Sequence, residues 1–78
     1  MEIKEFERKL DADEMKFIKS KLFDEIPMIE FYQDRKTGEI FKVSYRVHCE
    51  AIHVDKVHFD ELESENLKET VEEFEKKL

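Results

Sequence analysis

All three histidines of the chain and its only cysteine lie within eleven residues, in the stretch VHCEAIHVDKVHF. These are His48, Cys49, His53 and His58. Imidazole and thiolate groups are the usual protein ligands of zinc and nickel, so the first question is whether this stretch is a metal site.

The answer depends on how residues 51–59 fold, and the sequence allows two alternatives. If Asp55 and Lys56 form a two-residue turn, His53 lies opposite His58 with Cβ atoms roughly 4.5–5.5 Å apart, close enough to share one ion. If the segment is one strand with a bulge, the two histidines point to opposite faces. Asp-Lys is a poor sequence for a tight hairpin, so we prefer the single strand. We therefore predict no metal or other cofactor; His53, His58 and Asp55 are the ligands to test.

Catalytic chemistry is not indicated by any motif. His48 and Cys49 are neighbours in sequence, but a Cys–His pair needs spatial convergence and an oxyanion site to act as a nucleophile. The sequence contains no glycine-rich phosphate loop, no HExxH and no GxSxG. We predict that the protein is not an enzyme.

Acidic residues are concentrated in the last quarter of the chain. The net charge is −7, and residues 60–78 carry eight acids and three bases. Such a balance repels nucleic acid phosphates, because binding to the backbone needs clustered lysine and arginine.

The same segment has the pattern of an amphipathic helix. Leu67, Val71, Phe74 and Leu78 recur at i, i+4, i+7 and i+11, and Ser64 is the expected N-cap. If these apolar residues face the core, the opposite face is acidic. The candidate partner-binding residues on it are Glu61, Glu65, Glu69, Glu72 and Glu73.

An acidic helix face can be a solvated surface or a recognition surface for a basic partner. On the second interpretation the protein is a small non-enzymatic protein-binding module, an adaptor or inhibitor. Nucleic acid mimicry, with carboxylates in the place of phosphates, is its extreme form. The expected partner is another protein with a basic surface.

A second functional hypothesis is nucleic acid binding through an open sheet face. Phe31, Phe41, Tyr45 and Phe59 are expected on the buried side of the sheet, which leaves the other side partly exposed. Aromatic side chains on such a face can stack on bases. The residues of this alternative patch are Tyr32, Arg35, Lys36, Ile40, Lys42 and Arg46. A homodimer through this face or a sheet edge is a further alternative.

The first 26 residues predict helical structure. Ile3, Phe6 and Leu10 have i, i+3, i+7 spacing. Asp11 with Glu14 resembles a capping pair that opens a second helix, which Pro27 would end. Its apolar stripe would be Met15, Ile18 and Leu22. One long helix over residues 2–25 is the alternative.

The middle of the chain predicts a β-hairpin. Ile29 and Phe31 alternate with polar neighbours, and so do the odd-numbered residues from 41 to 47. Between them lies Gly38, the only glycine, which can supply the positive φ of a tight loop.

Together these patterns predict one α+β domain over residues 1–78. Its elements would be one or two N-terminal helices, a three-stranded antiparallel meander and a C-terminal amphipathic helix, in the order α-β-β-β-α. No apolar run approaches the roughly 18 residues of a membrane helix, and one cysteine forms no internal disulfide. We therefore expect a cytoplasmic protein without a membrane partner.

Overall fold

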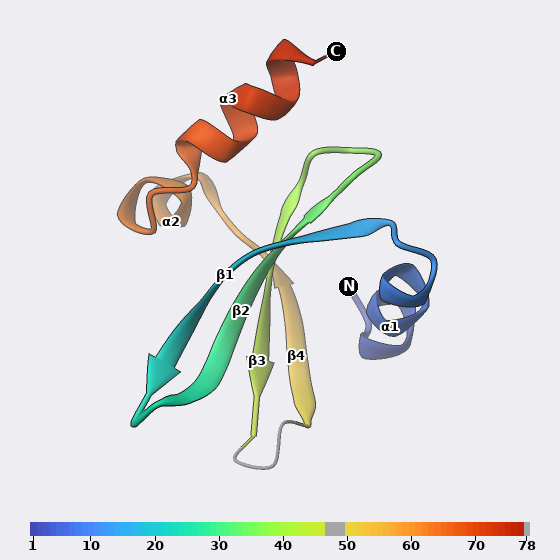
Figure 1. Cartoon of the computed structure of the whole chain (residues 1–78), viewed down its shortest axis with the longest axis vertical. Helices are drawn as coiled ribbons and strands as arrows, with labels where there is room; N and C mark the ends of the chain where they lie inside the picture. The colour runs from blue at the N-terminus through green and yellow to red at the C-terminus, as the bar shows by residue number, and fades with distance from the viewer. Residues whose placement is uncertain (47–49, 78) are drawn as a thin grey trace.

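The computed structural model describes residues 1–46 and 50–77, which form three helices and four strands (Figure 1). In chain order they are α1 (Ile3–Asp11), β1 (Met15–Phe23), β2 (Ile26–Asp34), β3 (Ile40–Tyr45), β4 (Ala51–Lys56), α2 (Phe59–Ser64) and α3 (Lys68–Lys76). The α+β class is confirmed, but the sheet has four strands where the sequence predicted three.

The four strands form one antiparallel sheet in the order β1-β2-β3-β4, so each strand pairs with its neighbour in sequence. Short connections between antiparallel neighbours explain this simple meander. Within the part of the chain that is described, no helix is long and apolar enough to cross a membrane.

The fourth strand is β1, where a second helix was predicted, and that prediction was wrong. Met15 and Phe17 lie on one face of the sheet, opposite Asp34 and Tyr32. The register then shifts between Phe17 and Lys19. This bulge places apolar residues at spacings that imitate a helical stripe. Asp13 has φ 57, so the chain turns there instead of continuing as a helix.

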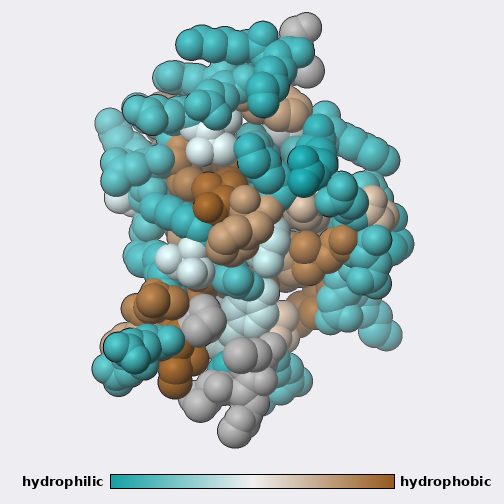
Figure 2. Space-filling view, in the orientation of Figure 1, coloured by the Kyte–Doolittle hydropathy of each residue, from teal (hydrophilic) through white to brown (hydrophobic). Residues whose placement is uncertain are grey.

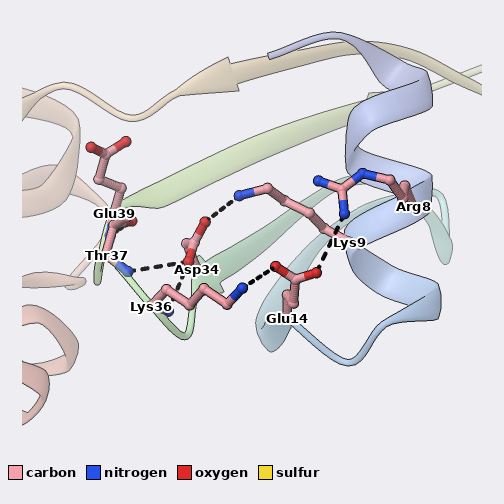
Figure 3. Close-up of polar contacts among 7 residues, drawn as sticks. All are labelled: Arg8, Lys9, Glu14, Asp34, Lys36, Thr37 and Glu39. Carbon is pink, nitrogen blue, oxygen red and sulfur yellow. Dashed lines mark hydrogen bonds and ion pairs between the residues drawn. The ribbon is translucent and has the colours of Figure 1, made fainter.

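The predicted helix over the first residues is confirmed as α1, with Phe6 buried and Ile3 and Leu10 packed beside it. Its last turn is fixed to the sheet by an ion pair: Lys9 Nζ donates to Asp34 Oδ2 at 2.6 Å (Figure 3). The hydrogen bond to Asp34 raises the pKa of Lys9. Asp34 itself is 2% exposed.

Asp34 also shapes the β2–β3 turn. Its Oδ1 accepts hydrogen bonds from the backbone amides of Lys36 at 2.8 Å and Thr37 at 3.1 Å (Figure 3). An aspartate that bonds amides further along the chain favours a turn. The predicted hairpin is confirmed, and Gly38 has φ 78 as its role requires.

The preferred single strand is confirmed for Ala51–Lys56, which form β4, but the strand ends there and the predicted bulge at Asp55–Lys56 is wrong, because these two residues pair regularly with Lys42 and Phe41. The alternative of a turn at Asp55–Lys56 is also wrong. Val43 pairs with Val54, and the register shifts between Ser44 and Tyr45. Phe59 starts a helix and is 68% exposed, so its predicted place on the buried side was also wrong.

Each face of the sheet carries its own hydrophobic cluster. Phe31 pairs with Lys42, so it lies on the face opposite Phe41; the prediction that Phe31 and Phe41 share a face was wrong. The first cluster, under α1, contains Phe6, Met15, Phe41, Val43 and Val54. The second, under α2 and α3, contains Phe31, Ile40, Val57 and Leu67. Helices therefore pack against both faces, and the expectation of helices on one face only was wrong.

The C-terminal segment forms two helices instead of one. Asn66 has φ 59, a left-handed conformation that ends α2. Ser64 is the last residue of α2, and its hydroxyl donates to the carbonyl of Glu61, so it is not the predicted N-cap. Of the predicted stripe, Leu67 is buried and Val71 and Phe74 are half-buried, while Leu78 lies outside the described residues.

Candidate functional site

Two of the five predicted partner-binding acids hold α2 against the sheet. Lys42 Nζ lies 2.8 Å from Glu61 Oε2, and Lys21 Nζ lies 2.8 Å from Glu65 Oε1. Lys19 also donates to the backbone carbonyl of Glu65. The hydrogen bond with Lys21 is the main reason that the pKa of Glu65 lies below its ordinary value. These two carboxylates are thus engaged within the molecule.

The other three predicted acids, Glu69, Glu72 and Glu73, are exposed on α3. No ion pair joins any of them to another described residue. They leave a smaller acidic surface than the sequence predicted, at one end of the molecule (Figure 1).

The alternative sheet-face patch is not one surface. Tyr32 pairs with Phe41 and Ile40 with Gln33, so Tyr32 and Ile40 lie on opposite faces. Ile40 is buried, and Lys42 is engaged with Glu61. The remaining members, Arg35, Lys36 and Arg46, are exposed at the ends of strands.

The histidine stretch offers no metal centre among residues 1–46 and 50–77, where no group of three potential ligands converges. His53 is exposed opposite Ser44, and His58 is exposed at the start of α2. Asp55 lies opposite Lys42. His48 and Cys49 lie outside the described residues.

The end of the β1–β2 hairpin is the feature that the sequence did not predict. Leu22 is 62% exposed, Phe23 71% and Ile26 37%. We call these three residues the apolar hairpin end. Figure 2 shows hydrophobic atoms gathered where the hairpin ends, at the lower left. Phe23 and Ile26 are cross-strand partners and share a face, whereas Leu22 precedes Phe23 in β1 and points to the other face. Single exposed apolar residues are common, but a hairpin end that is apolar on both faces is a candidate interaction site.

The turn inside this patch has an unusual backbone. Asp24 has φ 52 and Glu25 has φ 66, so two consecutive residues other than glycine are left-handed. Two positive φ values are what a two-residue hairpin turn requires, and glycine or asparagine normally supplies them. The left-handed region costs a residue with a Cβ roughly 1–2 kcal/mol. The turn is therefore tight and strained, and it presents its apolar flanks on a short projection.

A row of aromatic rings runs from the core to the exposed surface of β1. The ring of Tyr32 packs edge-on against Phe6 at 5.0 Å and against Phe17 at 5.5 Å between centroids. Phe17 is 50% exposed. Burial, followed by the charge of Glu30, raises the pKa of Tyr32, whose hydroxyl donates to Glu30 at 3.3 Å. The exposed aromatic surface of β1 is thus anchored to a well-packed ring pair.

One sequence signal could have revealed the hairpin end. In KLFDEIPM, apolar residues flank exactly two polar ones, the spacing of a two-residue hairpin. Asp-Glu is not the usual turn pair, and the helical spacing of Met15, Ile18 and Leu22 competed with it.

No protein-family model matches this chain, and no curated protein and no solved structure shows significant similarity to it.

Proposed function

We propose that this protein is a small non-enzymatic protein-binding module, an adaptor or inhibitor, that contacts its partner through the apolar hairpin end. The exposure of Leu22, Phe23 and Ile26 on one turn carries the proposal. In a chain that is 45% charged, the exposure of these large apolar side chains to water is unfavourable and needs an explanation. Burying one large apolar side chain is worth roughly 1.5–3 kcal/mol, so a partner that covers the turn gains substantial affinity.

The partner should present an apolar pocket with a basic rim. Asp24 and Glu25 sit between the apolar residues, so any pocket that receives the turn must also meet two carboxylates. The net charge of −7, with Glu69, Glu72 and Glu73 exposed on α3, favours rapid encounter with a basic surface. If the partner binds DNA or RNA, these acids would act by mimicry of phosphates.

Site-specific photo-crosslinking tests this contact. A photoreactive phenylalanine analogue at position 23 is used to label and identify the partner in the source cell. The purified partner is then titrated with the wild-type chain and with a Leu22→Ser/Phe23→Ser variant. We expect the double substitution to weaken binding by about 30-fold or more, the effect of losing an interface hot spot of about 2 kcal/mol.

Phe59→Ser is the matched control, because Phe59 is an exposed aromatic residue of similar accessibility at the start of α2. Its affinity should stay within about threefold of wild type, as expected for a residue outside the contact. Equal losses for the double substitution and the control would refute the hairpin end as the binding site. So would sedimentation equilibrium showing a dimer that only the double substitution dissociates, because the occupant would then be a second copy of the chain.

The acidic part of the proposal has a separate readout. Reversing Glu69, Glu72 and Glu73 to lysine should lower the association rate and its dependence on salt while leaving the dissociation rate nearly unchanged. An unchanged association rate at low salt would show that α3 does not steer the encounter.

A further inference from the structure

A concave surface lies at the opposite end of β2 from the apolar hairpin end. It is a cavity of about 360 Å³ between the start of β1, the β2–β3 turn and α3. The volume is within the range of small-ligand pockets, roughly 300–1,000 Å³. We call it the basic pocket, because Lys16, Arg35, Lys36 and Lys77 line it.

The charge around this pocket runs against the charge of the whole molecule. Four cations and one acid, Glu73, line it, although the chain as a whole carries −7. Two of the cations are ion-paired: Glu14 Oε1 lies 3.0 Å from Lys36 Nζ (Figure 3), and Asp13 Oδ1 lies 3.6 Å from Arg35 Nη2. These pairs hold the two turn cations in place, and with the paired acids included the four cations exceed the three acids by one charge.

The rest of the lining supplies neutral polar groups and an aromatic wall. Gln33 is 4% exposed, and its amide donates to the carbonyl of Gly38 at 3.1 Å. Thr70 contributes a hydroxyl, and the ring of Phe74 packs over Gly38. A few fixed polar groups beside an apolar wall are typical of sites for small organic ligands.

We propose that the basic pocket binds a small organic phosphate, with the phosphate among the lysines and arginine and a ring or apolar group against Phe74. Lys16 and Lys77 form no ion pair with another described residue, so their ammonium groups can donate to a ligand. A phosphate accepts such hydrogen bonds on more oxygens than a carboxylate does. A nucleic acid strand fits less well, because Glu69, Glu72 and Glu73 on α3 repel phosphates that continue beyond the pocket. This proposal is independent of the one for the hairpin end.

Titration of the ¹⁵N-labelled chain with phenyl phosphate at low ionic strength tests the proposal. We expect saturable shifts at the amides of Lys16, Arg35, Lys36, Thr70 and Lys77, and none at the hairpin end. Inorganic phosphate should bind more weakly, because it does not use Phe74. Benzoate should bind more weakly as well, because it carries a single charge.

Four substitutions test the direction of the effect. Lys16→Gln and Lys77→Gln should each weaken phenyl phosphate binding about fivefold, the effect of one charge-assisted contact at a solvent-open site. Glu73→Gln should strengthen it, because a repelling carboxylate is removed. Lys4→Gln, an equal charge change on α1, should leave it unchanged. Melting temperatures of all four variants check that the fold is retained.

Three outcomes would overturn the proposal. The first is the absence of saturable shifts with phenyl phosphate. The second is equal affinity for benzoate, or equal weakening by Lys4→Gln, which would leave only unspecific charge attraction. The third is tighter binding of a short single-stranded oligonucleotide at the same amides, which would make the surface a nucleic acid site.

Discussion

At the scale of single residues, the β1–β2 turn combines two features that oppose stability. Its flanking side chains are exposed and apolar, and Asp24 and Glu25 adopt left-handed backbone conformations. Strain of this kind persists where the surrounding structure imposes it, and it is frequent at binding sites.

Substituting glycine for Glu25 should therefore stabilise the protein, by about 1 kcal/mol, because glycine adopts φ 66 without a Cβ penalty. Chemical denaturation with urea measures the change. Glu25→Ala removes the same carboxylate but keeps the Cβ, so it should bring no such gain. Equal stabilisation by alanine would show that charge, and not backbone strain, is responsible.

Asp34 links α1 to the β2–β3 turn, and its ionisation should make the free energy of unfolding depend on pH in the acidic range. Burial alone would raise the pKa of Asp34, but the hydrogen bonds from Lys9 and the amides of Lys36 and Thr37 outweigh it and hold the pKa below its ordinary value of 3.8. A carboxyl with a lowered pKa in the folded state contributes stability above its unfolded pKa, and this contribution is lost as the pH falls through the lower, folded value.

We accordingly expect the free energy of unfolding to fall below about pH 4, where the unfolded chain takes up the proton first. At pH 7, Asp34→Asn should cost about 1.5–3 kcal/mol, the worth of a hydrogen bond to a charged group. Its stability should also vary less with pH in the acidic range. An identical acid dependence for wild type and variant would assign the effect to other carboxyls, such as Glu14 and Glu65.

At the scale of elements, the position of α3 depends on a close contact between its Phe74 ring and the backbone of Gly38. The ring of Phe74 lies against Gly38 so closely that a Cβ at Gly38 would come within 3.0 Å of Phe74 Cγ. Glycine at this position thus serves the turn, through its positive φ, and also the docking of α3.

Gly38→Ala should destabilise the protein by about 1–3 kcal/mol, the usual range for overpacking, in addition to the strain of a left-handed alanine. Combining it with Phe74→Leu should recover part of the loss, because the smaller side chain vacates the overlap. Thermal unfolding of the two single variants and the double variant gives the coupling between the two sites. Simple additivity would show that the loss comes from the backbone alone.

The elements also show where sequence patterns suffice. The hairpin around Gly38 and the helix containing Phe6 were predictable, because each rests on one unambiguous signal: a lone glycine between alternating strands, and a helical apolar stripe. The strand β1 was not, because its bulge beyond Phe17 brings apolar residues into helical spacing, and pairing with β2 overrides the local preference. The sequence did not predict that the C-terminal helix is divided at Asn66. Asparagine can adopt a left-handed conformation, and the helical spacing of the apolar residues around it shows no interruption.

The candidate sites were harder to predict than the fold. Glu61 and Glu65 were assigned to a free surface, but they pair with Lys42 and Lys21, which are distant in sequence. The basic pocket was not predicted either, because two of the residues that line it, Lys16 and Lys77, are distant in sequence. Contacts between distant residues depend on strand order and on which face each helix covers. Neither can be predicted from the spacing of residues within one segment.

At the scale of the whole molecule, the sheet separates two hydrophobic clusters, and each is covered by different helices. The central strands contribute to both: Phe31 of β2 is 1% exposed and Val43 of β3 is 0% exposed. α3, by contrast, has no fully buried residue. The two sides of the molecule should therefore open independently.

Native-state hydrogen exchange should show this division. We expect the amides of Phe31 and Val43 to exchange slowest, at the rate of global unfolding, and those of α3 to exchange through a local opening of lower free energy. Phe74→Leu should speed exchange in α3 while leaving α1 unchanged. Protection in α3 equal to that of β3 would mean that both clusters unfold as one unit.

The strand β2 runs from Ile26, part of the apolar hairpin end, to Asp34, whose neighbours Gln33 and Arg35 line the basic pocket. The eight steps between these two residues, at about 3.3 Å each, give a separation of about 26 Å, compared with the 38 Å length of the molecule. A macromolecule docked at one end would leave the other end free, so both could be loaded at once without steric competition. If both proposed contacts are made, the sheet would separate the bound protein and the bound small molecule by a fixed distance.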